Sequence, residues 1–241
     1  MLDADGSPAA RDAIVTAARG SDALREYAID ALLEHGAPQG VALAREAIAS
    51  GDGTLARNAA TALGRAADST ATDALLAGAA STQPGARRAA AGALAERGDQ
   101  RSREALARLV GDRDAEVRHE AFNGLAEVGT SDAVATLSKV AAGGSADDRR
   151  AAISALGNVN GEAGHDALAQ VLTTERDPTL VLAAIREARS GGAILNDALQ
   201  TALHDPDATH EVQTAAAERL DAVGALAETD RHYLERDDVL E

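Results

Sequence analysis

The sequence predicts an all-α protein, a right-handed α-solenoid (superhelix) of about seven two-helix repeats. A short pattern of arginine, alanine, leucine and glycine recurs along the 241 residues, at a nearly constant spacing. No stretch alternates apolar and polar side chains with the period of a β-strand. Periods of about 20–50 residues are typical of solenoids, in which each repeat packs only against its neighbours.

One anchor residue marks each repeat, and successive anchors are 31 or 32 residues apart. The anchors are Leu32, Leu63, Leu94, Leu125, Leu156, Ala188 and Leu220. The residue four positions before each anchor is always alanine: Ala28, Ala59, Ala90, Ala121, Ala152, Ala184 and Ala216. Glycine stands four positions after five of the anchors: Gly36, Gly98, Gly129, Gly192 and Gly224. This pattern predicts a helix, called helix A, with one apolar face and a glycine C-cap.

A second helix, called helix B, follows in each repeat, where apolar residues such as Leu106 and Leu109 lie 11–16 positions after the anchor. Breakers such as Pro84-Gly85 separate helix B from the next helix A. We therefore predict one domain over residues 1–241, with a partial N-terminal repeat at 8–19 and a charged C-terminal capping helix at 226–240. The partial repeat is either an N-terminal cap or the remainder of a longer polypeptide.

Composition narrows the possible functions. The formal net charge is −16, with 39 Asp and Glu against 23 Lys and Arg, which argues against binding to nucleic acid or anionic membranes. Cysteine is absent, so thiol catalysis and disulfides are excluded, and no apolar run approaches a membrane span of about 20 residues. We expect a cytoplasmic protein. Lys139 is the only lysine, and the acidic, lysine-poor composition fits either a salt-accumulating halophile or a GC-rich genome.

The pattern V-R-x-x-A-x-x-x-L-x-x-x-G at Val117–Gly129, with its copies over about residues 8–240, resembles the short HEAT-like repeats first named from phycobiliprotein (bilin) lyases. The resemblance implies an α-solenoid. It leaves the activity open, because the family includes lyases, a di-iron hydroxylase, adaptors and scaffolds.

The dipeptide His119-Glu120 resembles the iron-binding His-Glu pairs of the HEAT-like deoxyhypusine hydroxylases. Such a site needs several pairs in matched positions, whereas His210-Glu211 lies ten positions before its anchor and His119 lies six before. We therefore expect His119 to be a surface or interface residue, and we predict no metal, no cofactor and no catalytic residue.

Arginine recurs seven positions before four of the anchors, at Arg25, Arg87, Arg118 and Arg149. A repeated position indicates a repeated structural task. We expect each of these side chains to bond loop carboxylates and carbonyls between neighbouring repeats. The alternative is a basic strip that binds an acidic ligand.

The helix B residues 10 and 14 positions after each anchor lie four apart and therefore on one helical face. Six of them are predicted to contact a partner: Asp73, Glu104, Arg108, Lys139, Asp166 and Gln170. We expect Arg108 and Lys139 to be neighbours in adjacent repeats. The predicted function is a non-catalytic scaffold or adaptor for another protein or peptide. The alternatives are a bilin lyase-type enzyme or enzyme subunit, and a structural repeat module of a longer polypeptide. The sequence does not identify the partner or the oligomeric state.

Overall fold

The computed structural model describes residues 7–51, 53–189 and 192–234, and all regular secondary structure within these residues is helical. The α-helices are α1 (Pro8–Ala18), α2 (Asp22–Glu34), α3 (Pro38–Ala49), α4 (Gly53–Arg65), α5 (Ser69–Ala79), α6 (Pro84–Arg97), α7 (Gln100–Leu109), α8 (Ala115–Val128), α9 (Ser131–Gly143), α10 (Ala146–Gly157), α11 (Glu162–Thr174), α12 (Pro178–Glu187), α13 (Ala193–His204) and α14 (His210–Ala222). A short 3₁₀ helix, η1 (Glu228–Tyr233), follows. The predicted all-α class is confirmed.

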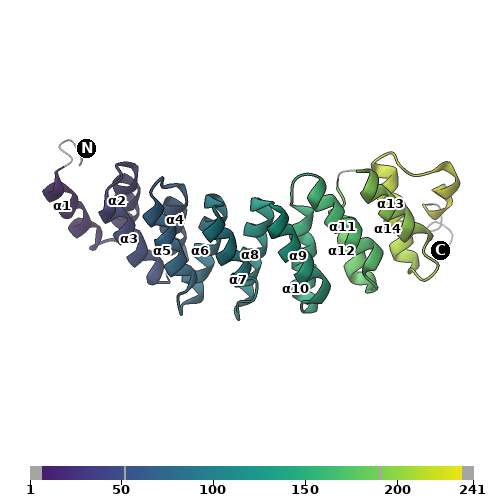
Figure 1. The fold of residues 1–241 in the computed structure, drawn as a ribbon, viewed down its shortest axis with the longest axis horizontal. Coiled ribbons are helices and arrows are strands. Elements are labelled where there is room, and N and C mark those ends of the chain that lie inside the picture. The colour runs from purple at the N-terminus through teal and green to yellow at the C-terminus, as the bar shows by residue number, and fades with distance from the viewer. Residues whose placement is uncertain (1–6, 52, 190–191, 235–241) are drawn as a thin grey trace. The chain divides into compact units, whose positions relative to one another are not determined.

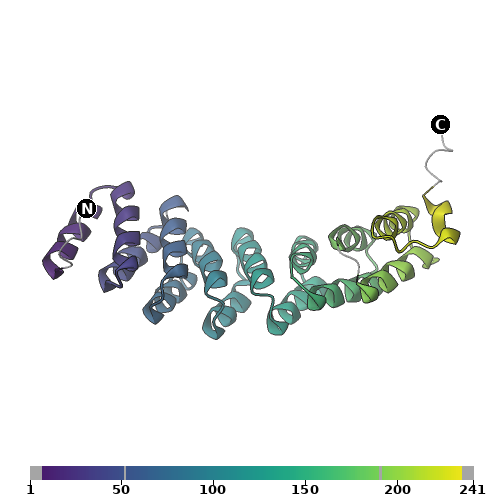
Figure 2. The same ribbon diagram turned by 90° about the horizontal axis from the view of Figure 1, so that it is seen from above.

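The chain divides into two compact units, Met1–Val128 and Gly129–Glu241. Within each unit the helices stack side by side in chain order, in two layers (Figures 1 and 2). The A helices are α2, α4, α6 and α8 in the first unit and α10, α12 and α14 in the second. The B helices are α1, α3, α5, α7, α9, α11 and α13. This two-layer stacking is the α-solenoid arrangement that the sequence predicts, while a single continuous domain over residues 1–241 stays a prediction.

The core follows the repeat pattern. Every anchor, and every alanine four positions before an anchor, is at most 3% exposed. The largest fully buried side chain is Phe122, which takes the place of smaller apolar residues at the matching position of α4 and α6. Because alanine adds little bulk, neighbouring A helices approach closely, and the anchor leucines fill the layer between A and B.

Helix ends are set by local chemistry. The side chains of Ser7, Asp68, Asp99, Ser145, Asp177 and Thr209 accept an N–H bond from the first turn of the following helix. Gly36, Gly98, Gly129 and Gly224 have φ values of 59–71°, as predicted for glycines that end helix A. Gly192 does not end a helix: α12 stops earlier, at Glu187, and Gly192 is the N-cap of α13 with φ −120°.

The C-terminal cap differs from the predicted helix. The segment predicted as helix 226–240 contains η1, one 3₁₀ helix of six residues, and residues 235–240 lie outside the described part. Asp230 of η1 is buried and its Oδ1 lies 3.1 Å from Nε2 of His204 on α13. The partial repeat predicted at residues 8–19 coincides with α1.

The arginines of the predicted ladder bond loops between repeats, as expected. Arg87 donates two bonds of 2.7 Å to the carboxylate of Asp112, and its Nη1 donates to the carbonyls of Ser81 and Thr82 at 3.0 and 3.1 Å. Arg149 bonds the Glu175 carboxylate through its Nη2, and its Nε donates to the carbonyl of Ala141 at 2.9 Å. The Arg87 hydrogen bond lowers the pKa of Asp112 below its usual range, against the opposing effect of burial.

Candidate protein-binding grooves

Neighbouring A helices meet in a constant register. Between α4 and α6, between α6 and α8 and between α10 and α12, the residue after one anchor faces the residue before the next anchor, and in the centre of the first unit both are small. A Cβ added to Gly64 of α4 would lie 3.2 Å from the carbonyl oxygen of Ala93 on α6. A Cβ added to Gly124 of α8 would lie 3.2 Å from the Cβ of Ala95 on α6. These two interfaces are closed because neither side of either pair carries bulk.

Two other A-helix interfaces open into grooves where a large side chain occupies one of these positions. Between α2 and α4, Leu33 and Ala62 form the pair, and both line a groove of about 700 Å³. Between α12 and α14, Arg219 takes the position of Ala93, and a groove of about 560 Å³ lies there. The Nη2 of Arg219 donates to the carbonyl of Arg186 at 3.3 Å.

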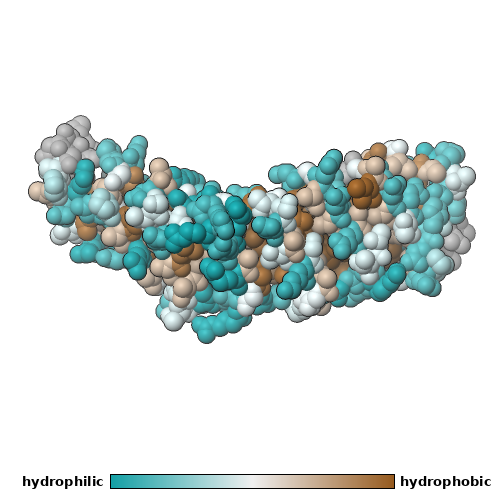
Figure 3. Space-filling view, in the orientation of Figure 1, coloured by the Kyte–Doolittle hydropathy of each residue, from teal (hydrophilic) through white to brown (hydrophobic). Residues whose placement is uncertain are grey.

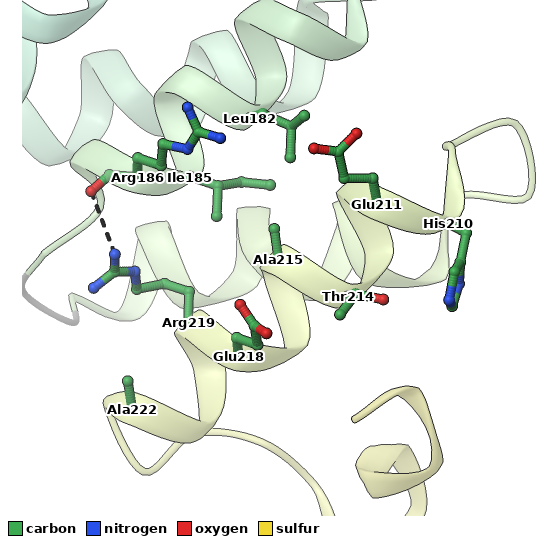
Figure 4. A pocket seen from close by; sticks show the side chains of 10 residues that line it. All are labelled: Leu182, Ile185, Arg186, His210, Glu211, Thr214, Ala215, Glu218, Arg219 and Ala222. Atoms are coloured by element: carbon green, nitrogen blue, oxygen red, sulfur yellow. Dashed lines mark hydrogen bonds between the residues drawn. The ribbon is translucent and has the colours of Figure 1, made fainter. Parts of the chain in front are cut away.

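The groove between α12 and α14, called the α12–α14 groove, has an apolar floor. Leu182 and Ile185 of α12 point toward Ala215 of α14 (Figure 4), and Ile185 is 2% exposed. The turn of α14 that follows His210 supplies one side, whereas the imidazole of His210 points away from the floor (Figure 4).

Charged side chains of both signs border this floor. Arg186 comes from α12, and Glu211, Glu218 and Arg219 come from α14. Arg186, Glu211 and Glu218 are exposed. An apolar floor with flanking charges suits a protein segment that offers an apolar side chain between polar ones, because the floor removes apolar surface from water and the rim fixes orientation.

The groove between α2 and α4 differs in charge. Glu26, Asp30 and Glu34 of α2 line it, and Arg65 of α4 is its only lining cation. Asn58 Nδ2 donates to Glu26 Oε1 at 2.7 Å. Burial raises the pKa of Asp30, and the nearby charges of Glu26 and Glu34 raise it further, while Arg65 opposes them.

The six residues predicted to contact a partner all lie exposed on B helices, Asp73 on α5, Glu104 and Arg108 on α7, Lys139 on α9, and Asp166 and Gln170 on α11. Asp73 pairs with Arg101 at 2.8 Å, and Glu104 accepts a bond from Gln100 at 3.0 Å. Arg108 belongs to the first unit and Lys139 to the second, so their proximity stays a prediction.

The grooves themselves were not predicted. The signal was present in the repeat alignment, since Leu33 and Arg219 are large where the pattern is otherwise mostly alanine or glycine. Reading that signal requires knowing that these two positions face each other across an interface, which periodicity within one helix does not give.

The His119-Glu120 pair is engaged in other contacts. Glu120 Oε2 lies 3.6 Å from Nε of Arg88, and the His119 ring lies at a tilt against Phe122, with centroids 6.2 Å apart. The described part of the chain contains no group of three or more His, Asp or Glu side chains placed to hold a metal.

Hydrophilic residues cover much of the face shown in Figure 3, and hydrophobic ones are scattered over both units. Within the described residues, no helix has both the length and the apolarity needed to cross a membrane.

Comparison with known families matches residues 72–157 to HEAT repeats and residues 148–174 to the PBS lyase HEAT-like repeat. Residues 72–174 thus match HEAT-type repeats. The second match covers α11 and most of α10, in the same unit as the α12–α14 groove. The resemblance inferred from Val117–Gly129 is thus confirmed. A search of curated proteins gave no match.

Several solved structures are similar to this chain. The complex of CpcE and CpcF of phycocyanin lyase from Nostoc sp. is 20% identical with a TM-score of 0.45, covering 96% of this chain and 94% of that one. Human deoxyhypusine hydroxylase in complex with glycerol is 21% identical with a TM-score of 0.44, covering 93% and 88%. An engineered protein is 21% identical with a TM-score of 0.42, covering 77% and 96%.

These findings correct one prediction. The repeat matched at residues 148–174 is named from a lyase. This match overturns the prediction that the chain is not an enzyme, which rested on the lack of a catalytic motif and gave no weight to the lyase that names the repeat.

Proposed function

We propose that this HEAT-like repeat protein is a protein-binding subunit of a lyase-type enzyme. The α12–α14 groove would hold a segment of the protein on which the enzyme acts. The observation that carries the proposal is the groove of about 560 Å³, which combines the apolar floor of Leu182, Ile185 and Ala215 with charged residues of both signs. The lyase class is supported by the PBS lyase HEAT-like repeat at residues 148–174 of the same unit.

The groove is suited to a protein segment more than to a small molecule. It is bordered by two helices along its length, so an extended or helical segment can lie between them and bury an apolar side chain on the floor. The flanking residues Arg186, Glu211 and Glu218 offer donors and acceptors at the rim, where charged contacts give specificity and add less affinity.

Blocking the groove tests this function. Ala215→Trp fills the floor, whereas Ala163→Trp adds the same side chain at an exposed position of α11 and serves as the control. Each variant is used for affinity capture from the native host at native salt, with quantitative mass spectrometry. We expect at least one protein to be captured by the wild type and by Ala163→Trp, and to be depleted by about tenfold with Ala215→Trp.

The enzymatic part of the proposal is tested on the captured protein. Its mass and absorption spectrum are recorded before and after incubation with this chain and the co-captured subunits, with a tetrapyrrole as the first group tested. A covalent group gained or lost only when the wild-type chain is present supports a lyase-type subunit. Equal capture by both tryptophan variants, or no covalent change, would overturn the proposal.

We further propose that exposed B-helix residues of each unit contact a partner: Asp73, Glu104 and Arg108 in the first unit, and Lys139, Asp166 and Gln170 in the second. Among the described residues, neither Arg108 nor Lys139 forms an ion pair, so both charges are available to a partner. Reversing both charges with Arg108→Glu and Lys139→Glu should weaken capture of the partner while the helical circular dichroism stays unchanged. Undiminished capture would remove this surface from the proposal.

A further inference from the structure

One side of α2 carries exposed apolar side chains. Leu24 is 53% exposed and Tyr27 is 60% exposed, and they are two of the three large apolar residues that are exposed in the described part of the chain. They are three positions apart on a helix, so they lie on the same side. The third, Ile194, is 57% exposed and stands alone on α13.

The matching positions of the other repeats are covered. The position of Leu24, eight before the anchor, is apolar and at most 5% exposed in five of the six following repeats: Leu55, Ala86, Val117, Leu180 and Val212. The position of Tyr27 is half-buried in all six. Each of those repeats follows a complete pair of helices A and B, whereas α2 follows only α1 within the described residues. The exposed side of α2 is therefore the surface on which a preceding helix A packs.

The contacts made at this surface elsewhere in the first unit indicate what it fits. Asn58, which matches Tyr27, donates to Glu26 of the preceding A helix at 2.7 Å. Glu96 on α6 pairs with Arg65 of the preceding helix α4, with Nε and Oε2 3.7 Å apart. Gly64 of α4 lies against the same Glu96, because an added Cβ there would be 3.0 Å from its Oε2. A helix that packs here thus presents a small residue followed by an arginine.

The α2 surface repeats this requirement. Glu34 stands two positions after its anchor, as Glu96 does, and it is exposed beside the stripe formed by Leu24 and Tyr27. We propose that this surface binds a helix of a partner protein that carries small residues on its contact side and an arginine that pairs with Glu34.

A second copy of this chain fits the surface less well. The net charge of −16 makes copies of the chain repel each other, and the two Glu34 carboxylates would face one another across a symmetric pair of α2 helices. A basic helix from a partner satisfies both the packing and the charge.

A helix-stabilised, fluorescent peptide with the sequence Gly53–Arg65 is a suitable probe, because α4 makes the contacts described above and carries two arginines and no acid. Binding to the full chain is measured by fluorescence anisotropy at low and high salt. We expect saturable binding that weakens with salt. The double variant Leu24→Asp, Tyr27→Asp should weaken it by about tenfold or more, and Ile194→Asp should leave it unchanged.

A charge exchange makes the test specific. Glu34→Arg in the chain should weaken binding of the probe. Replacing the last arginine of the probe, which corresponds to Arg65, with glutamate should also weaken binding. Combining the two changes should restore it. Binding that is absent, or insensitive to Leu24, Tyr27 and Glu34, overturns the proposal.

Two further results would also overturn it. A wild-type dimer in sedimentation that Tyr27→Asp dissociates would show that a second copy covers the surface. Probe binding that occurs only after removal of residues 1–6 would show that the chain's own N-terminal segment does so.

Discussion

The closed interface between α4 and α6 and the open one between α12 and α14 occupy the same place in the repeat frame and differ in the residue that stands before the second anchor. Gly64 faces Ala93 in the first, whereas Arg219 stands at the position of Ala93 in the second. In the first, backbone and small side chains of the two helices touch. In the second, the arginine reaches the carbonyl of Arg186 and a groove remains. The comparison teaches that the repeat frame fixes where helices meet, whereas the residues at the facing positions differ from one interface to the next.

The loops before α8 and α14 extend this comparison and give the largest expected effect. Asp112 and its partner Arg87 are 10% and 7% exposed, whereas the pair of Asp205 and Arg176 is 29% and 79% exposed with a 3.6 Å separation. Asp112→Ala leaves the Arg87 charge buried without its carboxylate and should cost about 3–5 kcal/mol in the free energy of unfolding. Asp205→Ala should cost about 1 kcal/mol or less.

Urea unfolding followed by far-UV circular dichroism measures both variants. Similar costs for the two aspartates would contradict the view that the loops of the closed region are held more firmly than those of the open region.

Exchanging the residue before the anchor tests the facing pair directly. Ala93 is 2% exposed, so Ala93→Arg forces a long charged side chain into the closed interface and should cost about 3 kcal/mol. Ala62→Arg makes the same change at the same repeat position, beside the groove between α2 and α4, and should cost about 1 kcal/mol or less. Thermal unfolding of the two variants gives the difference. Equal losses would mean that the facing pair does not control the width of the interface.

The reverse exchange at the open interface should have a smaller effect. Arg219→Ala removes one bond to the Arg186 carbonyl and leaves little buried surface unmatched, so the free energy of unfolding should change by about 1 kcal/mol. The same urea titration measures it. A much larger loss of stability would show that Arg219 holds α12 and α14 together. The groove would then exist because of this contact, and the contact would not be a by-product of the groove.

The smallest expected effects are on the pH dependence of stability. The carboxylates of Asp112 and Asp30 should change this dependence in opposite directions. The pKa of Asp112 is lowered in the folded protein, so its contribution is fully present above the unfolded pKa of about 4 and is lost as the pH falls through the folded value. The pKa of Asp30 is raised, chiefly by burial, so stability is lost as the pH rises through its folded value.

Asp30→Asn should therefore raise the melting temperature at pH 7 and have little effect near pH 3. Asp112→Asn should lower the melting temperature at pH 7, and the difference between this variant and the wild type should become smaller at acidic pH. Melting curves of the two variants and the wild type over this range check the signs. A lower melting temperature of Asp30→Asn at pH 7 would contradict the environment described for the groove between α2 and α4.

The sequence by itself determined the repeat frame. The spacing of Ala121, Leu125 and Gly129 is local to one helix, so period and capping chemistry specify helix A without any knowledge of its neighbours. The arginine ladder was predictable for a related reason, because a side chain repeated at one position performs one task. The ends of individual helices were predicted less accurately. The pattern predicted that a helix A ends at Gly192, whereas α12 ends earlier, at Glu187.

Only the tertiary structure decided which interfaces are closed and which are open. The width of a groove depends on two residues about 30 positions apart, such as Gly64 and Ala93, and on whether their side chains point at each other. The exposure of Leu24 and Tyr27 likewise depends on what lies before α2 in space. Whether a side chain is buried depends on both helices that pack against each other at that point. The sequence pattern of one helix describes only one of the two.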